Sequence, residues 1–329
     1  MKTLKVWIYV SLLTSICYGQ DIHWSQFNYN PIFLSPSKTG DFKGDYRFHS
    51  NFRNQWKSVT KPFTTSSFSF DMPIENFHDI ALGALFFNDF AGDGKLTTNE
   101  ITLSVAKPFQ IDSNLTFRIG INLGINNRNF NPNNLKFDNQ YNGVYFDPNS
   151  PNFENLQSTS KTNLTTGIGF NLDQKIKTVE VQYGLAFYNL NRPNQGFYGA
   201  KVLRPIRTSF FSNLKFPLTN KLYLFSALNL QIQKKYSAFT LGSSIHYKFE
   251  LKNNNTDLSL GCWYRIKDAF IINLGANYLN WFGGISYDIT LSSLKVANNF
   301  RGGPEFVLRY IISKYKPENT FRKICPDYL

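Results

Sequence analysis

The chain has 329 residues, a net charge of +13 and 42% hydrophobic residues, yet its mean hydropathy is only −0.30. No apolar run after residue 20 approaches the ~20 residues that a membrane helix needs, so helical membrane spanning is excluded. Aromatic residues make up 17% of the chain, with 32 Phe and 18 Tyr, a composition typical of strands and of the aromatic girdles of membrane barrels.

The N-terminus is organised as a secretory signal peptide. Lys2 and Lys5 precede an apolar run over residues 6–13, and small residues at the −3 and −1 positions predict cleavage after Gly19. The mature chain would then carry a net charge of +11, that is, +13 less the two lysines. Residues 1–19 are therefore expected to be removed.

The next segment, residues 20–44, has no sustained hydrophobic period. It contains Trp24, Phe27 and Phe33 among several prolines and glycines. We expect this segment to form an ordered periplasmic arm and not a strand.

From residue 45 to residue 314, apolar and polar residues alternate in one repeated unit. The clearest segment is 114–126, in which one face carries large apolar residues and the other carries Thr, Arg, Gly and Asn. A soluble protein would place charges on that second face, whereas Gly and Asn suit the lumen of a barrel. The expected strands are 45–54, 65–74, 79–90, 98–107, 114–126, 163–173, 178–190, 207–216, 221–231, 237–249, 256–266, 269–279, 281–291 and 302–314.

These segments predict an all-β fold, a transmembrane antiparallel β-barrel of about 14 strands, whose even number leaves both termini on one side. Connections after even-numbered strands are short, whereas the longest ones, 127–162 and 191–206, follow odd-numbered strands. Short periplasmic turns and long external loops produce that asymmetry in outer-membrane barrels. Residues 45–314 are thus assigned to an outer-membrane barrel, and residues 315–329 to a C-terminal tail.

The basic and aromatic residues are explained most simply by the barrel. The basic residues are dispersed without a stripe, so nucleic acid is not an expected partner. Arg47, Arg53 and Arg118 fall on lumen-facing positions, and other basic residues would meet anionic lipid head groups or an acidic partner. Trp56, Trp263 and Trp281 are expected to be interfacial anchors.

Residues 89–100 partly match a twelve-residue calcium loop, with Asp89, Asp93 and Glu100 at positions 1, 5 and 12. Ala91 replaces the ligand at position 3, and the flanking segments are strands instead of helices. We therefore predict a hairpin turn in which Asp93-Gly94 supplies the positive φ, with no bound metal.

Catalytic signatures are weak. The four histidines, His23, His49, His78 and His246, share no recognisable nucleophile motif, and the sequence contains no phosphate loop or zinc spacing. The sequence predicts no enzymatic activity and no cofactor. A surface hydrolase would need a Ser or acidic partner close in space to a His, which the sequence leaves open.

Short stretches scattered over nearly the whole mature chain belong to one pattern; they are 20–27, 35–40, 53–56, 91–97, 189–195, 286–289, 303–306 and 325–326. Together these stretches resemble the PorP/SprF family of the type IX secretion system of Bacteroidetes. Two departures from the family pattern are Ile22 in place of Pro, and Ser35-Pro36-Ser37 in place of Asn-Pro-Ala.

The resemblance implies an outer-membrane β-barrel accessory of type IX secretion that assists export or surface attachment of particular large proteins, often adhesins connected with gliding motility. The implied partners are the secretion components and the carboxy-terminal sorting domains of the cargo. The residues predicted to bind partners or to dock the arm are Gln20, His23, Trp24, Gln26, Arg53, Trp56, Asn191, Pro193 and Asn194. Pro193 and Trp56 are equally well explained by turn formation and barrel packing.

The alternative function is that of an outer-membrane porin or small-solute transporter. About fourteen strands lie between the eight-stranded barrels that side chains fill and the sixteen-stranded barrels that hold water. The sequence does not decide between an open and a filled lumen.

Overall fold

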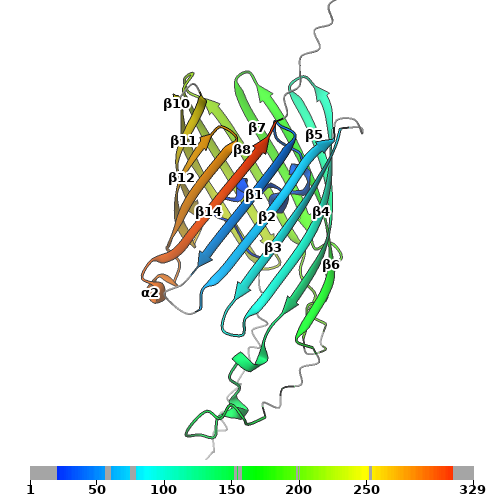
Figure 1. The fold of residues 1–329 in the computed structure, drawn as a ribbon, viewed down its shortest axis with the longest axis vertical. Helices are drawn as coiled ribbons and strands as arrows, with labels where there is room; N and C mark the ends of the chain where they lie inside the picture. Colours follow the sequence, from blue (N-terminus) through cyan, green and yellow to red (C-terminus); the bar gives the residue numbers. More distant parts are fainter. Residues whose placement is uncertain are drawn as a thin grey trace, which may run out of the picture.

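Fourteen strands form one closed antiparallel barrel, which confirms the predicted fold class (Figure 1). The computed structural model describes residues 21–55, 61–74, 79–151, 154, 158–197, 199, 201–251 and 254–313. Within these ranges, no helix has both the length and the apolar character required to cross a membrane. The predicted signal peptide, the C-terminal tail, Gln20 and Trp56 lie outside the described residues.

Each strand pairs with its neighbours in sequence, and β1 closes the barrel by pairing with β14. The strands are β1 Tyr46–Gln55, β2 Phe63–Ile74, β3 Ile80–Ala91, β4 Leu96–Asp112, β5 Leu115–Asn129, β6 Ser160–Ile176, β7 Val179–Tyr188, β8 Arg207–Pro217, β9 Leu222–Gln233, β10 Tyr236–Leu251, β11 Asn254–Arg265, β12 Ala269–Tyr278, β13 Trp281–Thr290 and β14 Arg301–Ile312. The helical elements are η1 Phe27–Tyr29, α1 Pro31–Leu34, η2 Pro36–Lys38, η3 Pro132–Asn134, η4 Asp138–Gln140 and α2 Lys295–Asn298.

The apolar and polar residues that alternate in the sequence lie on opposite faces of the barrel wall. On β5, Ile121, Leu123 and Ile125 are each more than half exposed on the outer face. Asn126 follows Ile125, so its side chain points to the other face of the strand, where it is buried toward the lumen. An apolar exterior over most of the strand length is what a lipid bilayer requires of a barrel.

Several strands extend beyond the predicted bounds. The strand expected at 98–107 spans Leu96–Asp112, because β4 and β5 continue to pair past the apolar stretch as far as Asp112↔Leu115. Similarly, β5 and β6 pair out to Asn129↔Ser160, which shortens the loop expected over 127–162. Backbone pairing does not need apolar side chains, so periodicity alone underestimates these lengths.

The connections divide the barrel into two ends. We call the end with the connections β2–β3, β4–β5, β6–β7, β8–β9, β10–β11 and β12–β13 the turn end, and the opposite end the loop end. Connections at the turn end are short, as predicted, while β5–β6 and β7–β8 make the long loops at the loop end (Figure 1). Residues 92–95 form a turn at the loop end, but positive φ occurs at Gly92 (66°) and Lys95 (49°) instead of the predicted Asp93-Gly94.

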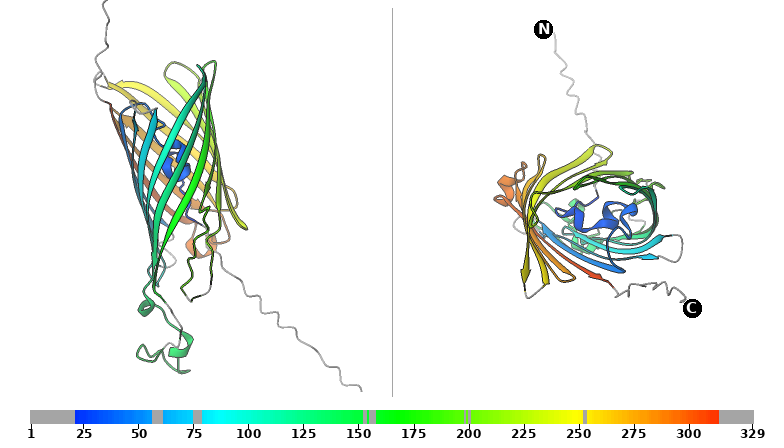
Figure 2. Two further views of the ribbon diagram at one scale, coloured as in Figure 1. Left: turned by 90° about the vertical axis from the view of Figure 1, so that its right-hand side faces the viewer. Right: turned by 90° about the horizontal axis from the view of Figure 1, so that it is seen from above.

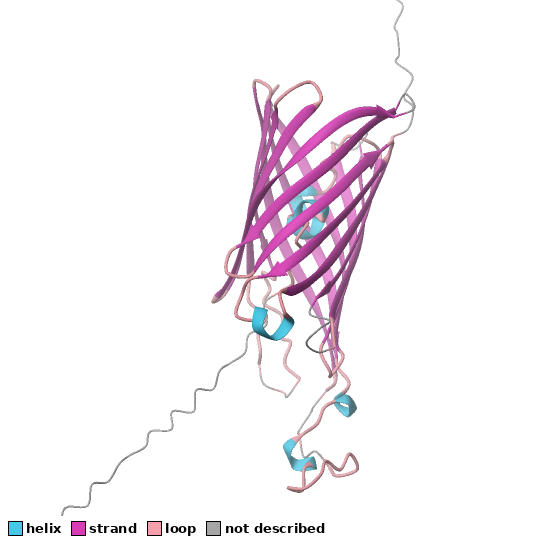
Figure 3. Ribbon diagram, turned by 90° about the vertical axis from the view of Figure 1, so that its left-hand side faces the viewer, coloured by secondary structure: helices cyan, strands magenta, loops and turns pink. Residues whose placement is uncertain are grey.

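Residues 21–44, called the arm below, lie inside the barrel. Figures 2 and 3 show the short helices η1, α1 and η2 within the ring of strands. The arm begins near the loop end, where Asp21 N–H bonds Gln233 at the end of β9, and reaches the turn end where Asp45 N–H bonds Ile312 O. The sequence predicts an ordered periplasmic arm here; the structure places this segment within the lumen, where the apolar and polar side chains of the arm meet matching side chains of the wall.

Trp263 also differs from its prediction as an interfacial anchor. It is buried on the lumen side of β11, where its ring lies edge-on to Phe27 at 5.8 Å. Trp281 is exposed on the outside at the turn end and stacks on Tyr310 at 4.2 Å, an arrangement typical of an interfacial anchor.

Candidate functional site

The arm and the lumen wall share one apolar core. Trp24, Phe27 and Leu34 of the arm are buried against residues from strands on different sides of the barrel. The wall residues of this core are Phe87 of β3, Phe211 of β8, Ala227 of β9, Trp263 of β11, and Ala269 and Ile271 of β12. A buried aromatic side chain contributes several kcal/mol to such packing, on the order of 3–5 when it is truncated to Ala.

A second contact is made by charged groups that are almost completely buried. We call Arg53, Arg265, Asp288 and Glu305 the Arg53 cluster; they come from β1, β11, β13 and β14. Arg53 Nη2 lies 2.7 Å from Asp288 Oδ2, and Arg265 Nη2 lies 3.0 Å from the same oxygen. Arg53 Nε is 3.8 Å from Glu305 Oε2. Two guanidinium groups and two carboxyl groups thus pair within the lumen wall.

The Arg53 cluster binds the backbone of the arm directly. The N–H groups of Ser25 and Gln26 donate to the two carboxylate oxygens of Glu305, each at 2.8 Å. Ser25 Oγ donates to Asp288 Oδ1 at 2.6 Å, and Arg53 Nη1 donates to the carbonyl of His23. The turn at residues 23–26 is therefore fixed to four strands at once.

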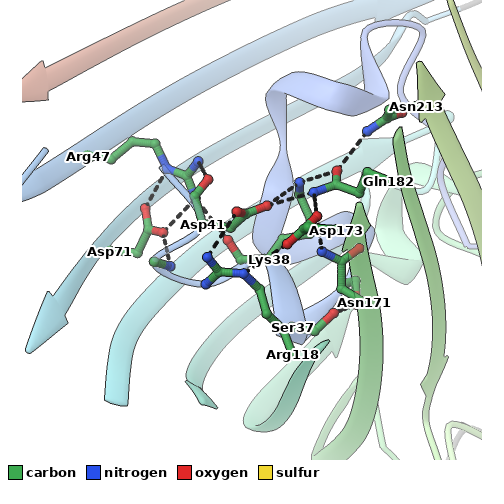
Figure 4. Close-up of polar contacts among 12 residues, drawn as sticks. Ser37, Lys38, Asp41, Arg47, Asp71, Arg118, Asn171, Asp173, Gln182 and Asn213 are labelled. Carbon is green, nitrogen blue, oxygen red and sulfur yellow. Dashed lines mark hydrogen bonds and ion pairs between the residues drawn. The ribbon is translucent and has the colours of Figure 1, made fainter. Parts of the chain in front are cut away.

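Further along, Lys38 and Asp41 of the arm join a polar network that Figure 4 shows in full. Lys38 Nζ lies 2.6 Å from Asp41 Oδ2 and also donates to Gln182 of β7. Arg118 of β5 bridges Asp41 (3.4 Å) and Asp173 of β6 (3.0 Å). Charges of the arm are thus paired with charges of the wall.

The last part of the arm is held by Arg47 and Asp71. Asp71 of β2 accepts hydrogen bonds from Gly40 N–H (2.7 Å) and from Arg47 of β1 (2.6 and 2.9 Å), as Figure 4 shows in part. Arg47 also donates to the carbonyls of Lys38 and Asp41, each at 3.0 Å. Gly40 has a φ of 70°, which allows the chain to turn toward Asp71.

At the loop end, the start of the arm is paired with the β7–β8 loop. Arg204 bridges Asp21 (3.0 Å) and Glu100 (3.2 Å), and Asn189 Nδ2 donates to Asp21 at 3.2 Å. Burial alone would lower the pKa of Arg204, but these two carboxylates outweigh burial and raise it. The Arg204 guanidinium therefore stays charged and keeps residue 21 at the loop end.

In the β11–β12 turn, Asp268 accepts a hydrogen bond from Arg265 at 2.8 Å and lies 3.7 Å from His23 Nε2. Burial alone would raise the pKa of Asp268, but His23 and the Arg265 guanidinium outweigh burial and hold it well below its ordinary value. Asp268 is therefore ionised at neutral pH and adds a carboxylate beside the Arg53 cluster.

Glycines let the arm approach the wall closely. A Cβ atom at Gly120 of β5 would overlap the backbone of Pro36 and Ser37, and one at Gly169 of β6 would overlap Ser35 and Pro36. These positions face η2, which contacts β4, β5 and β6. The Gly-rich inner face of the wall is thus shaped to the arm.

We expect Gly120→Val to displace the arm around η2, because the added side chain would overlap the backbone of Pro36 and Ser37. The measurement is limited trypsin digestion of the folded barrel, with mass spectrometry of cleavage after Lys38 and Lys43. The expected result is at least tenfold faster cleavage in G120V than in the parent chain.

The matched control is Gly283→Val on β13, where an added Cβ meets no atom within 4 Å. G283V should keep the parent cleavage rate. Equal protection of the arm in both variants would show that close approach at Gly120 is not needed to hold it.

The arm separates two cavities, one toward each end of the lumen. The loop vestibule, of about 550 Å³, is lined by Asp21 and His23 of the arm, by wall residues such as Phe87 and Arg128, and by Arg204. The turn vestibule, of about 740 Å³, is lined by Lys38, Asp41 and Lys43 of the arm and by residues at the turn end of β5 to β10 and of β14, among others. Both volumes fall in the range of ligand pockets.

The predicted partner-binding residues fall into two groups. His23, Trp24, Gln26 and Arg53 come together around the Arg53 cluster, and Trp24 is only 2% exposed. They hold the arm in the lumen and do not form an external surface in this structure. Their role in binding partner proteins is still a prediction from the sequence.

The second group belongs to the β7–β8 loop. Asn191 is exposed and donates to Leu164 O at 2.7 Å, while Asn194 Oδ1 accepts from Val202 N–H at 2.9 Å. Pro193 is buried, and its carbonyl accepts from Arg204 N–H at 2.9 Å. These residues shape the loop that positions Arg204 over the start of the arm.

Sequence reasoning missed the partners of the arm on the wall. Asp71, Arg265, Asp288 and Glu305 were not singled out, although two of them lie in stretches that carry the family resemblance. One signal could have identified the acidic residues among them. An acidic residue at a lumen-facing position of a membrane strand is costly unless it is paired, so it indicates a partner inside the lumen.

Sequence reasoning also missed a chain of hydrogen bonds along β10 and β11. Ser244 Oγ is 3.0 Å from His246 Nε2, and His246 Nδ1 is 3.0 Å from Asp257 Oδ1. The order of groups resembles that of serine hydrolases. However, Ser244 is buried beside the arm, and β10 pairs on both sides, so the backbone N–H groups near Ser244 serve the sheet and do not form an oxyanion hole. Among the described residues, no group of three or more His, Cys, Asp or Glu is arranged to hold a metal ion.

Comparison with known proteins gives both a family and a fold. A family model described as "Type IX secretion system membrane protein PorP/SprF" matches residues 16–310. No curated protein sequence matches the chain. The toluene transporter TbuX of Ralstonia pickettii aligns with a TM-score of 0.51 and 10% identity over 86% of this chain and 92% of its own. The CymD monoaromatic hydrocarbon channel aligns with a TM-score of 0.50 and 9% identity over 88% and 94%. At such low identity these likenesses show the barrel fold alone.

Proposed function

The chain belongs to the PorP/SprF family of type IX secretion system membrane proteins, and on this basis we propose that it is a filled outer-membrane barrel that docks specific large cargo proteins during export or surface attachment. The cargo is of the adhesin or gliding type, and its carboxy-terminal sorting domain is the part recognised. In this proposal the barrel carries out no chemistry of its own and needs no cofactor.

The observation that carries the proposal is the arm inside the lumen. The arm is fixed by the apolar core around Trp24, by the Arg53 cluster and by the Lys38–Asp41 network. A porin needs a continuous aqueous path, whereas in this lumen the arm lies between the two vestibules. A rigid barrel with a filled lumen suits a membrane anchor that presents loops and vestibules to protein partners.

The test is a clean deletion of the gene, followed by quantification of large surface proteins on intact cells and inside them. We expect one cargo, or a small set, to be lost from the surface by at least tenfold while other surface proteins persist. Complementation with the parent gene should restore display. Unchanged surface proteins together with reduced uptake of a solute would contradict the docking function.

The second candidate is a small-solute transporter. One observation favours it: the loop vestibule contains the aromatic side chains Phe33, Phe63, Phe87 and Phe197, which could receive an apolar solute at the loop end. A solute entering there would meet the arm, so transport would require the arm to move. Uptake measurements in the deletion strain separate this candidate from docking.

A further inference from the structure

The two vestibules differ in charge. The loop vestibule is lined by three arginines and three carboxylates, so its fixed charges balance. The turn vestibule is lined by seven lysines and arginines against three carboxylates, an excess of four positive charges. Arg47, Arg118, Lys38 and Lys215 of this set have acidic partners. Asp71, the partner of Arg47, lies outside the lining, so counting it reduces the excess to three charges, those of the remaining three residues.

These three basic residues are Lys43, Lys175 and Arg309. Among the described residues, neither lysine has an ion-pair partner. Arg309 donates to an amide oxygen of Asn277 at 2.7 Å and lies over the ring of Phe282, and it makes no ion pair with a carboxylate of the described residues. Its Nε atom has no hydrogen-bond partner within the described part of the chain. The positive charge of the vestibule is therefore available to a ligand.

A buried side chain in the same vestibule is poorly satisfied. His49 lines the cavity and is only 3% exposed; neither ring nitrogen makes a hydrogen bond of good geometry to a described residue, and the polar group that acts on the ring is the backbone of Tyr29 in the arm. A buried polar group without a partner costs about 1–3 kcal/mol, so such a group is expected to meet a ligand or water. His49 and Arg309 occupy opposed positions on the paired strands β1 and β14.

The geometry points to the turn vestibule as a docking site for an acidic segment of a periplasmic protein. Short turns face the periplasm in outer-membrane barrels, so this cavity opens toward that compartment. Carboxylates of an extended segment would pair with Lys43, Lys175 and Arg309, and the segment's polar groups would reach His49. The inference rests on the proposed function, because a docking barrel needs a periplasmic contact as well as an external one.

The test uses the full mature chain, folded in neutral detergent, and two fluorescent peptides, octaglutamate and octaserine. We expect octaglutamate to bind and octaserine not to bind, with an affinity that falls as salt is raised because the charges are partly exposed. In the double variant K43Q/K175Q, the dissociation constant of octaglutamate should rise about tenfold, since each contact between unit charges in water contributes a few-fold in affinity.

The control is K95Q/K235Q, which removes the same charge from exposed turns at the loop end. An equal loss of affinity in this control, or equal binding of the two peptides, would overturn the proposal. The measurement uses purified protein, so it can fail while the deletion strain still loses its cargo. The docking site and the proposed function are therefore tested separately.

Discussion

Replacement of Arg53 by Ala should destabilise the folded barrel by about 3–5 kcal/mol, the range measured when one partner of a buried ion pair is removed. Arg53 is 1% exposed and Glu305 is fully buried. Without Arg53, Glu305 loses its nearest guanidinium and Asp288 keeps only that of Arg265. The measurement is the free energy of unfolding in urea, followed by tryptophan fluorescence.

The same substitution should loosen the arm, because Arg53 also donates to the carbonyl of His23. Lys215→Ala provides the control: the Lys215–Glu180 pair is 3.1 Å long but exposed, so its loss should cost less than about 1 kcal/mol. A loss in R53A no larger than that in K215A would mean that the Arg53 cluster does not hold the arm.

The barrel could be predicted from the sequence because a bilayer imposes a local rule. Lipid on one side and a polar lumen on the other force every strand to alternate, and each strand therefore carries its own signal. Residues such as Ile121 and Leu123 show this alternation without reference to any other part of the chain. Strand ends were less certain because pairing continues beyond the apolar band.

The position of the arm could not be predicted because its contacts are distant in sequence. Ser25 and Gln26 bond to Glu305, about 280 residues away, and no local period marks such a pair. Trp263 shows the same difficulty: its side chain faces the lumen because Phe27 packs there, and a tryptophan near a strand end gives no sign of that partner.

The stretches that resemble the PorP/SprF family meet in space although they are scattered along the chain. Gln26, Arg53, Asp288 and Glu305 belong to four such stretches and lie together around the first turn of the arm. Asn189, from a fifth stretch, bonds to Asp21. Much of the family pattern in this chain therefore encodes the attachment of the arm to the lumen wall.

Deletion of residues 23–43 should convert the barrel into a conducting pore. The arm is the part of the described chain that separates the loop vestibule from the turn vestibule, so its removal joins two cavities of about 550 and 740 Å³. Fourteen strands then enclose a lumen wider than that of an eight-stranded barrel, whose side chains can fill it. The measurement is current across a planar lipid bilayer: steady steps for the deletion, and none for the parent chain.

The control deletion removes residues 133–150 from the β5–β6 loop, a segment of similar length at the loop end that lies outside the lumen (Figure 1). It should leave the barrel without steady currents, and heat-dependent mobility on gels shows for each variant that the barrel is closed. If the arm-deleted barrel is closed but carries no current, other groups block the lumen. The arm would then be a docking element and not the barrier.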